Sequence, residues 1–315
     1  MHLSLTVGLP SVKGTDAAPP AAPTTTPREP NMSSAAPVPV SAALSAPVPV
    51  PEAADAALLS AVTRAVEDAG ATLRDRWTRH ARGVSLAEVV GALQANDDAV
   101  LAVLREPLLQ ARPGSRWAED ELAGGALPPG EWWVVDPAEG NINHVHGMAD
   151  WAVTATLVRD NRPELTVVHL PLTGDTYTAT AGGGARRNGR PLTVSARTDL
   201  AAALTGTGQA KPGEDARTLR RIGDSVTAML LNGLVVRVSV PATLQLVHVA
   251  AGSTDAFWQF SDVRSGLVAG ALLVSEAGGT VTDLAGAPWT PASRDFLAAA
   301  PGVHAAARAV LAPLA

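Results

Sequence analysis

Residues 132–147 read Trp-Trp-Val-Val-Asp-Pro-Ala-Glu-Gly-Asn-Ile-Asn-His-Val-His-Gly. The apolar, β-branched run ends abruptly in Asp136-Pro137-Ala138-Glu139-Gly140, so it predicts a buried strand that delivers two carboxylates onto a Gly-terminated turn. The ends of strands are where α/β proteins build their sites. Two carboxylates three residues apart can share one hard cation such as Mg²⁺, which prefers oxygen ligands. The alternative is an Asp-Pro turn that only closes a strand at the surface.

This stretch resembles the inositol monophosphatase family, whose signature here reads Asp-Pro-x-Asp-Gly-Thr. The second signature of that family is an acidic helix start that runs into Glu-Ala-Gly-Gly, and residues 266–279 resemble it, ending in Glu276-Ala277-Gly278-Gly279. The resemblance extends from about Glu52 to the C-terminus. It implies Mg²⁺-assisted hydrolysis of phosphate monoesters and, as is usual in the family, a dimer.

Length and composition set the outer limits. The 315 residues, 46% hydrophobic and 17% charged, suffice for one large domain or two closely packed halves. A net charge of -6 gives no basic surface for nucleic acid or an anionic membrane. The absence of cysteine excludes disulfides and thiolate metal sites, which is compatible with a cytoplasmic location. No apolar run reaches the roughly 18 residues of a spanning helix, and the first ten residues do not read as a signal peptide.

The order of the elements predicts a layered α/β/α/β architecture. Residues 1–51, rich in Ala, Pro, Ser and Thr, are expected to form a disordered tail, and Met32 is an alternative start. Residues 52–198 are expected to form an α+β half and residues 199–315 an α/β half. The predicted helices cover 52–80, 85–111, 216–231, 243–251, 267–277 and 303–314, the second opened by a Ser85-x-x-Glu88 capping box. The predicted strands cover 151–158, 164–170, 175–180, 204–207, 235–240, 256–259 and 280–283.

A glycine triplet at 182–184 invites comparison with a phosphate-binding loop. It lacks the Gly-Lys-Ser/Thr ending and the following helix of a P-loop, so a β-turn is the better prediction. The Asn188-Gly189 pair predicts a tight hairpin. The nearby Arg186, Arg187 and Arg190 are expected to lie on its solvated edge.

The resemblance assigns metal ligands. It implies that the first Mg²⁺ binds Glu119, Asp136, the carbonyl of Ala138 and Glu139, and Glu139 is one methylene longer than the family's Asp. The second ion needs an Asp ten residues before Glu276. That position is Gly266, which offers no ligand, although Asp262 is a displaced candidate. We therefore expect one well-held Mg²⁺ at most, or none.

The same comparison assigns the groups around the reacting centre. Asn141 replaces the family's threonine, so it can orient a water molecule but cannot relay a proton as a hydroxyl can. Asp97 aligns with the acid that orients that threonine. Gln245 and Gln259 stand where the family has acids that hold substrate hydroxyls. His144 replaces an aromatic residue beside the family-like His146.

These changes remove negative charge and favour direct capture of an anion, helped by the start of the helix near Gly266. His169 and His248, in apolar surroundings, are expected to be core residues. The expected anion-binding set is Gly140, Asn141, His144, His146, Gln245, Gln259 and Arg264. The expected catalytic set is Asp136, Glu139, Asn141, Asp97 and His144.

Three functions remain open. The first is a divergent phosphatase that acts on the phosphate or sulfate ester of a small polar metabolite. The second is a metal-independent elimination of sulfate or phosphate, in which His144, His146 and Arg264 hold the departing anion and the substrate closes a ring, for example an aziridine, in specialised metabolism. The third is a non-catalytic subunit of a homodimer or a heterodimer with a related chain.

Overall fold

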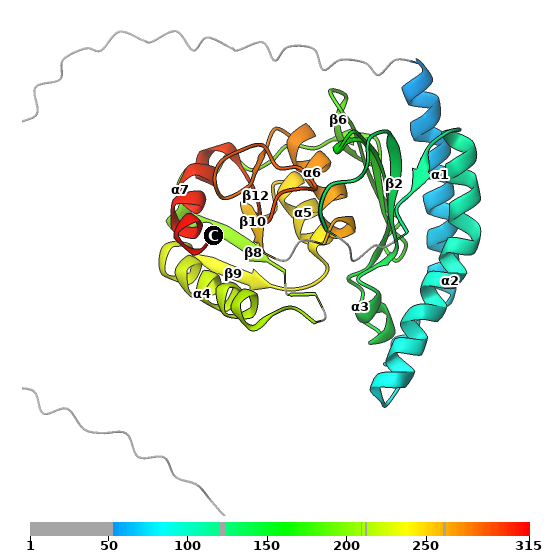
Figure 1. Cartoon of the computed structure of the whole chain (residues 1–315), viewed down its shortest axis with the longest axis horizontal. Coiled ribbons are helices and arrows are strands. Elements are labelled where there is room, and N and C mark those ends of the chain that lie inside the picture. Colours follow the sequence, from blue (N-terminus) through cyan, green and yellow to red (C-terminus); the bar gives the residue numbers. More distant parts are fainter. Residues whose placement is uncertain (1–52, 120–123, 209, 212, 261–262) are drawn as a thin grey trace, which may run out of the picture. The chain divides into compact units, whose positions relative to one another are not determined.

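The computed structural model describes residues 53–119, 124–208, 210–211, 213–260 and 263–315. The expected tail and Asp262 lie outside the described residues. The strands form two sheets, and helices lie between the sheets and on their outer faces (Figure 1). Within the described residues, every helix is too short or too polar to cross a bilayer.

A pair of long helices covers one face of the first sheet. Helix α1 (Ala53–Asp75) buries Val62, Val66 and Leu73 from a stripe at helical spacing. It ends five residues before the predicted His80. Helix α2 (Leu86–Ala111) begins as expected, because the Ser85 hydroxyl accepts a hydrogen bond from the Glu88 N–H at 3.3 Å.

The first sheet has the order β1-β2-β3-β4-β5-β6-β7, and the three strands predicted as an antiparallel meander are its β3, β4 and β5. Its neighbours are antiparallel except β1 and β2, which are parallel. Strand β3 is buried over seven consecutive residues because helices cover both faces of the sheet. The strands are β1 (Arg116–Trp117), β2 (Glu131–Glu139), β3 (Ala152–Arg159), β4 (Arg162–Leu170), β5 (Asp175–Thr180), β6 (Gly184–Arg187) and β7 (Arg190–Pro191).

The glycine-rich hairpin binds a carboxylate of the protein itself. The N–H groups of Gly182 and Gly184 both donate to Glu276, each at 2.8 Å. The glutamate of the Glu-Ala-Gly-Gly signature therefore fixes the hairpin to the end of a helix. Asn188 and Gly189 have φ angles of 49° and 78°, which gives the tight turn that their sequence predicts.

The second half alternates strands and helices around the sheet β11-β12-β10-β8-β9. Strand β12 (Phe296–Ala299) was not predicted, and β9 ends two residues earlier than expected. The remaining strands are β8 (Leu204–Thr207), β9 (Val235–Val238), β10 (Ala256–Gln259) and β11 (Thr280–Thr282). The helices are α4 (Ala216–Asn232), α5 (Ala242–Ala250), α6 (Ser265–Glu276) and α7 (Pro301–Leu311).

Three apolar cores lie between the layers, and a fourth, smaller cluster includes Val134 and Val268. The first lies between α1, α2 and the first sheet and includes the fully buried Trp133. The second surrounds α5 and α6, which lie between the two sheets (Figure 1). The third includes Trp258 and joins the second sheet to α4 and α7. This arrangement confirms the expected layered α/β/α/β architecture, with a further helical layer outside the second sheet.

The segments that follow β8, β9 and β10 begin at the same edge of the second sheet. Strands β8, β9 and β10 run parallel, so their carboxyl ends lie at the same edge of the second sheet. The segments after them begin at Gly208, Ser239 and Phe260. The edge of an open α/β sheet where carboxyl ends meet is a common ligand-binding position.

Candidate functional site

A cavity of about 220 Å³ lies at this edge. Strand β2 contributes its carboxyl end, and α6 contributes its first turn. The lining residues combine two carboxylates, two amides and one lysine with small residues and aliphatic side chains. They are Asp136, Ala138, Glu139, Gly140, Asn141, Ile142, Gly208, Ala210, Lys211, Val240, Pro241, Ala242, Gln259, Val263, Ser265 and Gly266.

The end of β2 leaves the regular sheet where the carboxylates appear. The register with β3 shifts between Asp136 and Glu139. Asp136 Oδ1 accepts a hydrogen bond from the N–H of Ala138 at 3.1 Å, which closes an Asx turn. The irregular strand end therefore brings Asp136, Ala138 and Glu139 to the same cavity.

Glu139 is 5% exposed and is tied to the neighbouring helices. The Thr243 hydroxyl lies 2.8 Å from Glu139 Oε2 and 3.1 Å from the carbonyl of Gly266. Thr243 thus links residues 136–140, the loop expected to bind metal and called the metal loop below, to the first turn of α6. Gly140, which follows, has a φ of 81°, and a Cβ there would lie 2.7 Å from the carbonyl oxygen of Asp150, so only glycine fits the turn.

Gly266 occupies the place from which a second acid would reach the cavity. A Cβ built on Gly266 lies 3.9 Å from Glu139 Oε2 and 3.7 Å from the Cβ of Ala242. Both are ordinary contacts, so the position has room for a side chain. Gly270, one turn further, has none, because its Cβ would lie 2.3 Å from Leu246.

Asn141 is held in one orientation. Its Nδ2 donates to Asp97 Oδ1 at 2.8 Å and to the carbonyl of Leu93 at 3.0 Å. Its Oδ1 accepts from Asn96 Nδ2 at 2.7 Å. Both amide protons are used, so the remaining capacity of Asn141 is a second lone pair on Oδ1. The structure brings Asp97 and Asn141 together as the resemblance implies.

His144 does not face the cavity, which corrects its expected role as an anion-binding and catalytic residue. The ring is fully buried, and Nε2 lies 2.9 Å from the carbonyl of Leu73. Since a carbonyl only accepts, Nε2 carries the proton, and Nδ1 accepts from Arg82 at 2.9 Å and Asn96 at 3.0 Å. His144 therefore joins α1, α2 and the helix α3 (Asn141–Val145) as a structural residue.

The burial of His144 leads to a prediction for stability. Desolvation lowers the pKa of His144 below its ordinary value of 6.5, and the charges of Arg82 and Arg76 act in the same direction. His144 therefore binds a proton less readily in the folded state than in the unfolded state. Stability is full above about pH 6.5 and falls as the pH drops below it, by at most about 1.4 kcal/mol per pH unit for each proton.

The measurement is the urea unfolding free energy at pH 7.5 and 5.5 for the wild type and His144→Gln. Burial also lowers the pKa of His169, His248 and His304, so both proteins lose stability in acid. Between pH 7.5 and 5.5, the unfolding free energy of His144→Gln should fall by less than that of the wild type. Equal losses would mean that His144 does not couple to folding.

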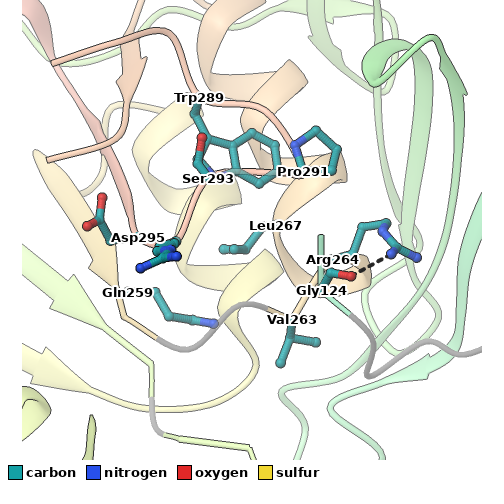
Figure 2. A pocket seen from close by; sticks show the side chains of 10 residues that line it. Gly124, Gln259, Val263, Arg264, Leu267, Trp289, Pro291, Ser293 and Asp295 are labelled. Carbon is teal, nitrogen blue, oxygen red and sulfur yellow. Dashed lines mark hydrogen bonds between the residues drawn. The ribbon is translucent and has the colours of Figure 1, made fainter. Parts of the chain in front are cut away.

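Arg264 also lies apart from the expected anion site. Its Nη2 donates to the carbonyl of Gly124 at 2.7 Å, and its Nε donates to that of Gly125 at 3.2 Å. It lines a small neighbouring cavity with Trp289 and Asp295, shown in Figure 2. The guanidinium thus fixes the loop that precedes β2, which corrects its assignment to the anion-binding set.

Glu119 is not brought to the metal loop, which corrects the expected convergence of Glu119, Asp136 and Glu139. Its side chain is 69% exposed and pairs with both terminal nitrogens of Arg105, one of them at 3.1 Å. Because Arg105 lies on α2, this ion pair directs the Glu119 carboxylate toward α2 and not toward Asp136 and Glu139. The described part of the chain contains no cluster of three or more His, Cys, Asp or Glu side chains placed to share a metal ion.

Of the other residues expected to bind an anion, Gln259 lines the cavity, whereas Gln245 and His146 do not. Gln259 lines the cavity, and it is 5% exposed. Gln245 is buried beside Ser239, to which its Nε2 donates, and does not line the cavity. His146 is exposed on the surface outside it. Gln245 and His146 are therefore corrected as anion-binding residues.

Lys211 was missed by the sequence analysis, although it lines the cavity. It follows β8 in the segment Gly208-Gln209-Ala210-Lys211. The available signal was its position just after a strand of the α/β half. A residue at the carboxyl end of such a strand points to the ligand crevice.

Among the described residues, the donor set at the end of β2 fits one Mg²⁺. Asp136, Glu139 and the Ala138 carbonyl supply oxygen donors on one short loop, and Mg²⁺ is ordinarily bound by one or two carboxylates together with substrate phosphate. Of the residues that the structure describes at the start of α6, Gly266 lines the cavity but has no side chain to offer as a ligand.

Comparison with known proteins agrees with this fold. Residues 55–313 match the model of the inositol monophosphatase family. Inositol-1-monophosphatase from Rhizobium meliloti is 34% identical over 244 residues, which cover 74% of this chain and 88% of the relative. Human inositol monophosphatase 2 is 32% identical over 225 residues, covering 70% of this chain and 78% of the relative. An inositol monophosphatase structure from Anabaena superposes with a TM-score of 0.65 at 28% identity, covering 80% of this chain and 94% of that one.

The fold and the carboxylate loop define a phosphatase of the layered α/β/α/β class. The chain belongs to the inositol monophosphatase family. Members of this family are phosphatases, which hydrolyse phosphate esters, and they generally depend on Mg²⁺.

Proposed function

We propose that this chain hydrolyses the phosphate ester of a small metabolite with a single Mg²⁺, held by Asp136, Glu139 and the carbonyl of Ala138. The observation that carries the proposal is the shared cavity of these three residues and Gly266. The loop keeps the donors for one cation, and the start of α6 lacks the donor for another. Family membership supplies the reaction class.

The bound Mg²⁺ would polarise the phosphoryl group and lower the pKa of a bound water. Asn141 orients the attacking water, because its Oδ1 keeps a free lone pair while Asp97 and Asn96 fix the amide. No proton passes through Asn141, since an amide is neither a base nor a relay at neutral pH. Asp136 and Glu139 are the carboxylates that line the cavity, and both are assigned to the ion. This arrangement predicts slower turnover than a hydroxyl relay would give.

No observation favours the elimination reaction. It required His144, His146 and Arg264 to surround one anion, and these side chains lie in a buried core, on the surface and on a loop, respectively.

The test is hydrolysis of inositol 1-phosphate and glycerol 2-phosphate by the full-length chain. We expect phosphate release with Mg²⁺ and none with EDTA. Release that is indifferent to EDTA would overturn the single-cation proposal. Absence of release under both conditions, with stabilisation by Mg²⁺ and phosphate in a thermal shift assay, would support the non-catalytic alternative.

A further inference from the structure

Asn96, on α2, connects Asn141 to the buried His144. The side chain of Asn96 is itself fully buried. Its Nδ2 donates to Asn141 Oδ1 at 2.7 Å and to His144 Nδ1 at 3.0 Å. The two protons of this amide are thus matched by two acceptors inside the protein. One of the two acceptors belongs to a residue that lines the cavity.

Neighbouring groups that can only donate fix the orientation of the Asn96 amide. Arg76 Nε lies 3.0 Å and Arg82 Nη2 lies 3.4 Å from Asn96 Oδ1. Since a guanidinium has no acceptor, the end of Asn96 that faces the two arginines must be the oxygen. The other end must then be the nitrogen. His144 Nδ1 can accept from this nitrogen because the ring proton is on Nε2.

The orientation of Asn141 follows from that of Asn96. A donor on Asn96 requires an acceptor on Asn141, so Oδ1 of Asn141 faces Asn96. Its Nδ2 faces the carbonyl of Leu93 and the carboxylate of Asp97, and both of these accept. A water that donates to Oδ1 keeps its own lone pairs for phosphorus. A water that accepted from an amide N–H would have one lone pair occupied.

We propose that Asn96 is a positioning residue for hydrolysis, because its donation to Asn141 makes that side chain present an oxygen to the attacking water. His144, as the second acceptor, holds Asn96 in the orientation that this requires. This inference rests on the proposed function, because it concerns the residue that orients the water there. Asn96 is not among the described residues that line the cavity, so it acts through Asn141.

Two positive charges face the oxygen of Asn96. Among the described residues, neither Arg76 nor Arg82 forms an ion pair with a carboxylate. Burial and, after it, the charge of Arg76 lower the pKa of Arg82, so the two guanidinium groups repel each other. A carboxylate in place of the Asn96 amide would offset this repulsion. Asn96→Asp should therefore fold, with a thermal midpoint equal to or above that of the wild type.

Asn96→Asp replaces the donor that faces Asn141 by an acceptor. With the ester that the wild type hydrolyses faster, kcat should fall by at least about tenfold, since a misplaced reacting group can cost about a hundredfold. KM should change by less than about threefold, because Asn96 does not touch the substrate. The matched control is Gln94→Glu, the same amide-to-carboxylate change on the exposed face of α2, where Gln94 donates to Asp98. It should leave kcat within about twofold.

The decisive comparison repeats Asn96→Asp in the Asn141→Ala background. If Asn96 acts through Asn141, the second substitution should lower kcat there by less than about twofold. An equal fall in kcat in both backgrounds, or no fall in the wild-type background, would overturn the inference. If Asn96→Asp does not fold, His144→Phe keeps an aromatic ring but removes the acceptor, and it is judged by the same cycle and criteria.

If the wild type hydrolyses neither ester, the proposed function fails on its own, and NMR decides the inference. The side-chain amide of Asn141 should then give two slowly exchanging protons in the wild type. Asn96→Asp should shift both signals and speed their exchange with solvent. Asn141 amide signals that are the same in the two proteins would overturn the inference.

Discussion

Asp136→Asn is expected to lower the Mg²⁺-dependent kcat/KM by more than about a hundredfold. Even partners that only orient metal ligands are typically worth about 10- to 100-fold in affinity or activity, so loss of a ligand charge should cost more. Asparagine keeps the size of the side chain and the oxygen that accepts from the Ala138 N–H. The fold should therefore survive, which circular dichroism and the thermal midpoint can check.

Glu119→Gln is the matched control for Asp136→Asn. It removes one carboxylate that the family resemblance assigns to the metal, but this carboxylate pairs with Arg105 at the surface. We expect the Mg²⁺-dependent kcat/KM to change by less than about threefold, in line with the small contribution of exposed ion pairs. Comparable losses in the two variants would show that Glu119 turns toward the metal loop during catalysis.

Gly266→Asp is expected to raise Mg²⁺-dependent turnover by at least about tenfold. The new Cβ meets only ordinary contacts, and it lies 3.9 Å from Glu139 Oε2, so the added carboxylate can share a second cation with Glu139. A cation that stabilises the leaving oxygen is worth several kcal/mol, and each 1.36 kcal/mol is tenfold in rate. An acid in the first turn of α6 also interacts favourably with the helix dipole.

Gly266→Ala is the control that shows whether the effect of Gly266→Asp comes from its carboxylate or only from the added side-chain volume. Alanine fills the same space without an oxygen donor, so it should leave turnover unchanged and raise stability slightly through its higher helix propensity. In Gly266→Asp, Mg²⁺ should raise the thermal midpoint more than it does in the wild type, because two carboxylates then lie close together. No gain in either turnover or midpoint would count against the proposal that the position of Gly266 can supply a ligand to a second cation.

The sequence predicts the frame of the molecule well where signals are local. The Ser85 cap, the meander and the Asn188-Gly189 turn each depend on neighbouring residues, and each lies where it was expected. Strand β12 was missed because four buried apolar residues show no periodicity that separates a strand from a helix. Its place is set by β10 and β11, to which it pairs.

The site was predictable only in part, for a similar reason. Asp136, Glu139 and Asn141 come from one continuous turn, so their meeting follows from the chain itself. The direction of His144 depends on Leu73, Arg82 and Asn96, which are between 48 and 71 positions away in the sequence. The position of Glu119 likewise depends on a partner from another element. A histidine beside a catalytic loop therefore gives no indication, from sequence alone, of whether it turns to the cavity or to the core.

The most direct test of the single-cation site is the number of Mg²⁺ ions bound at saturation. Equilibrium dialysis of the full-length chain against Mg²⁺, with saturating inorganic phosphate, should give one ion per wild-type chain and two per Gly266→Asp chain. Two ions on the wild-type chain, or none, would contradict the site described for Asp136, Ala138 and Glu139.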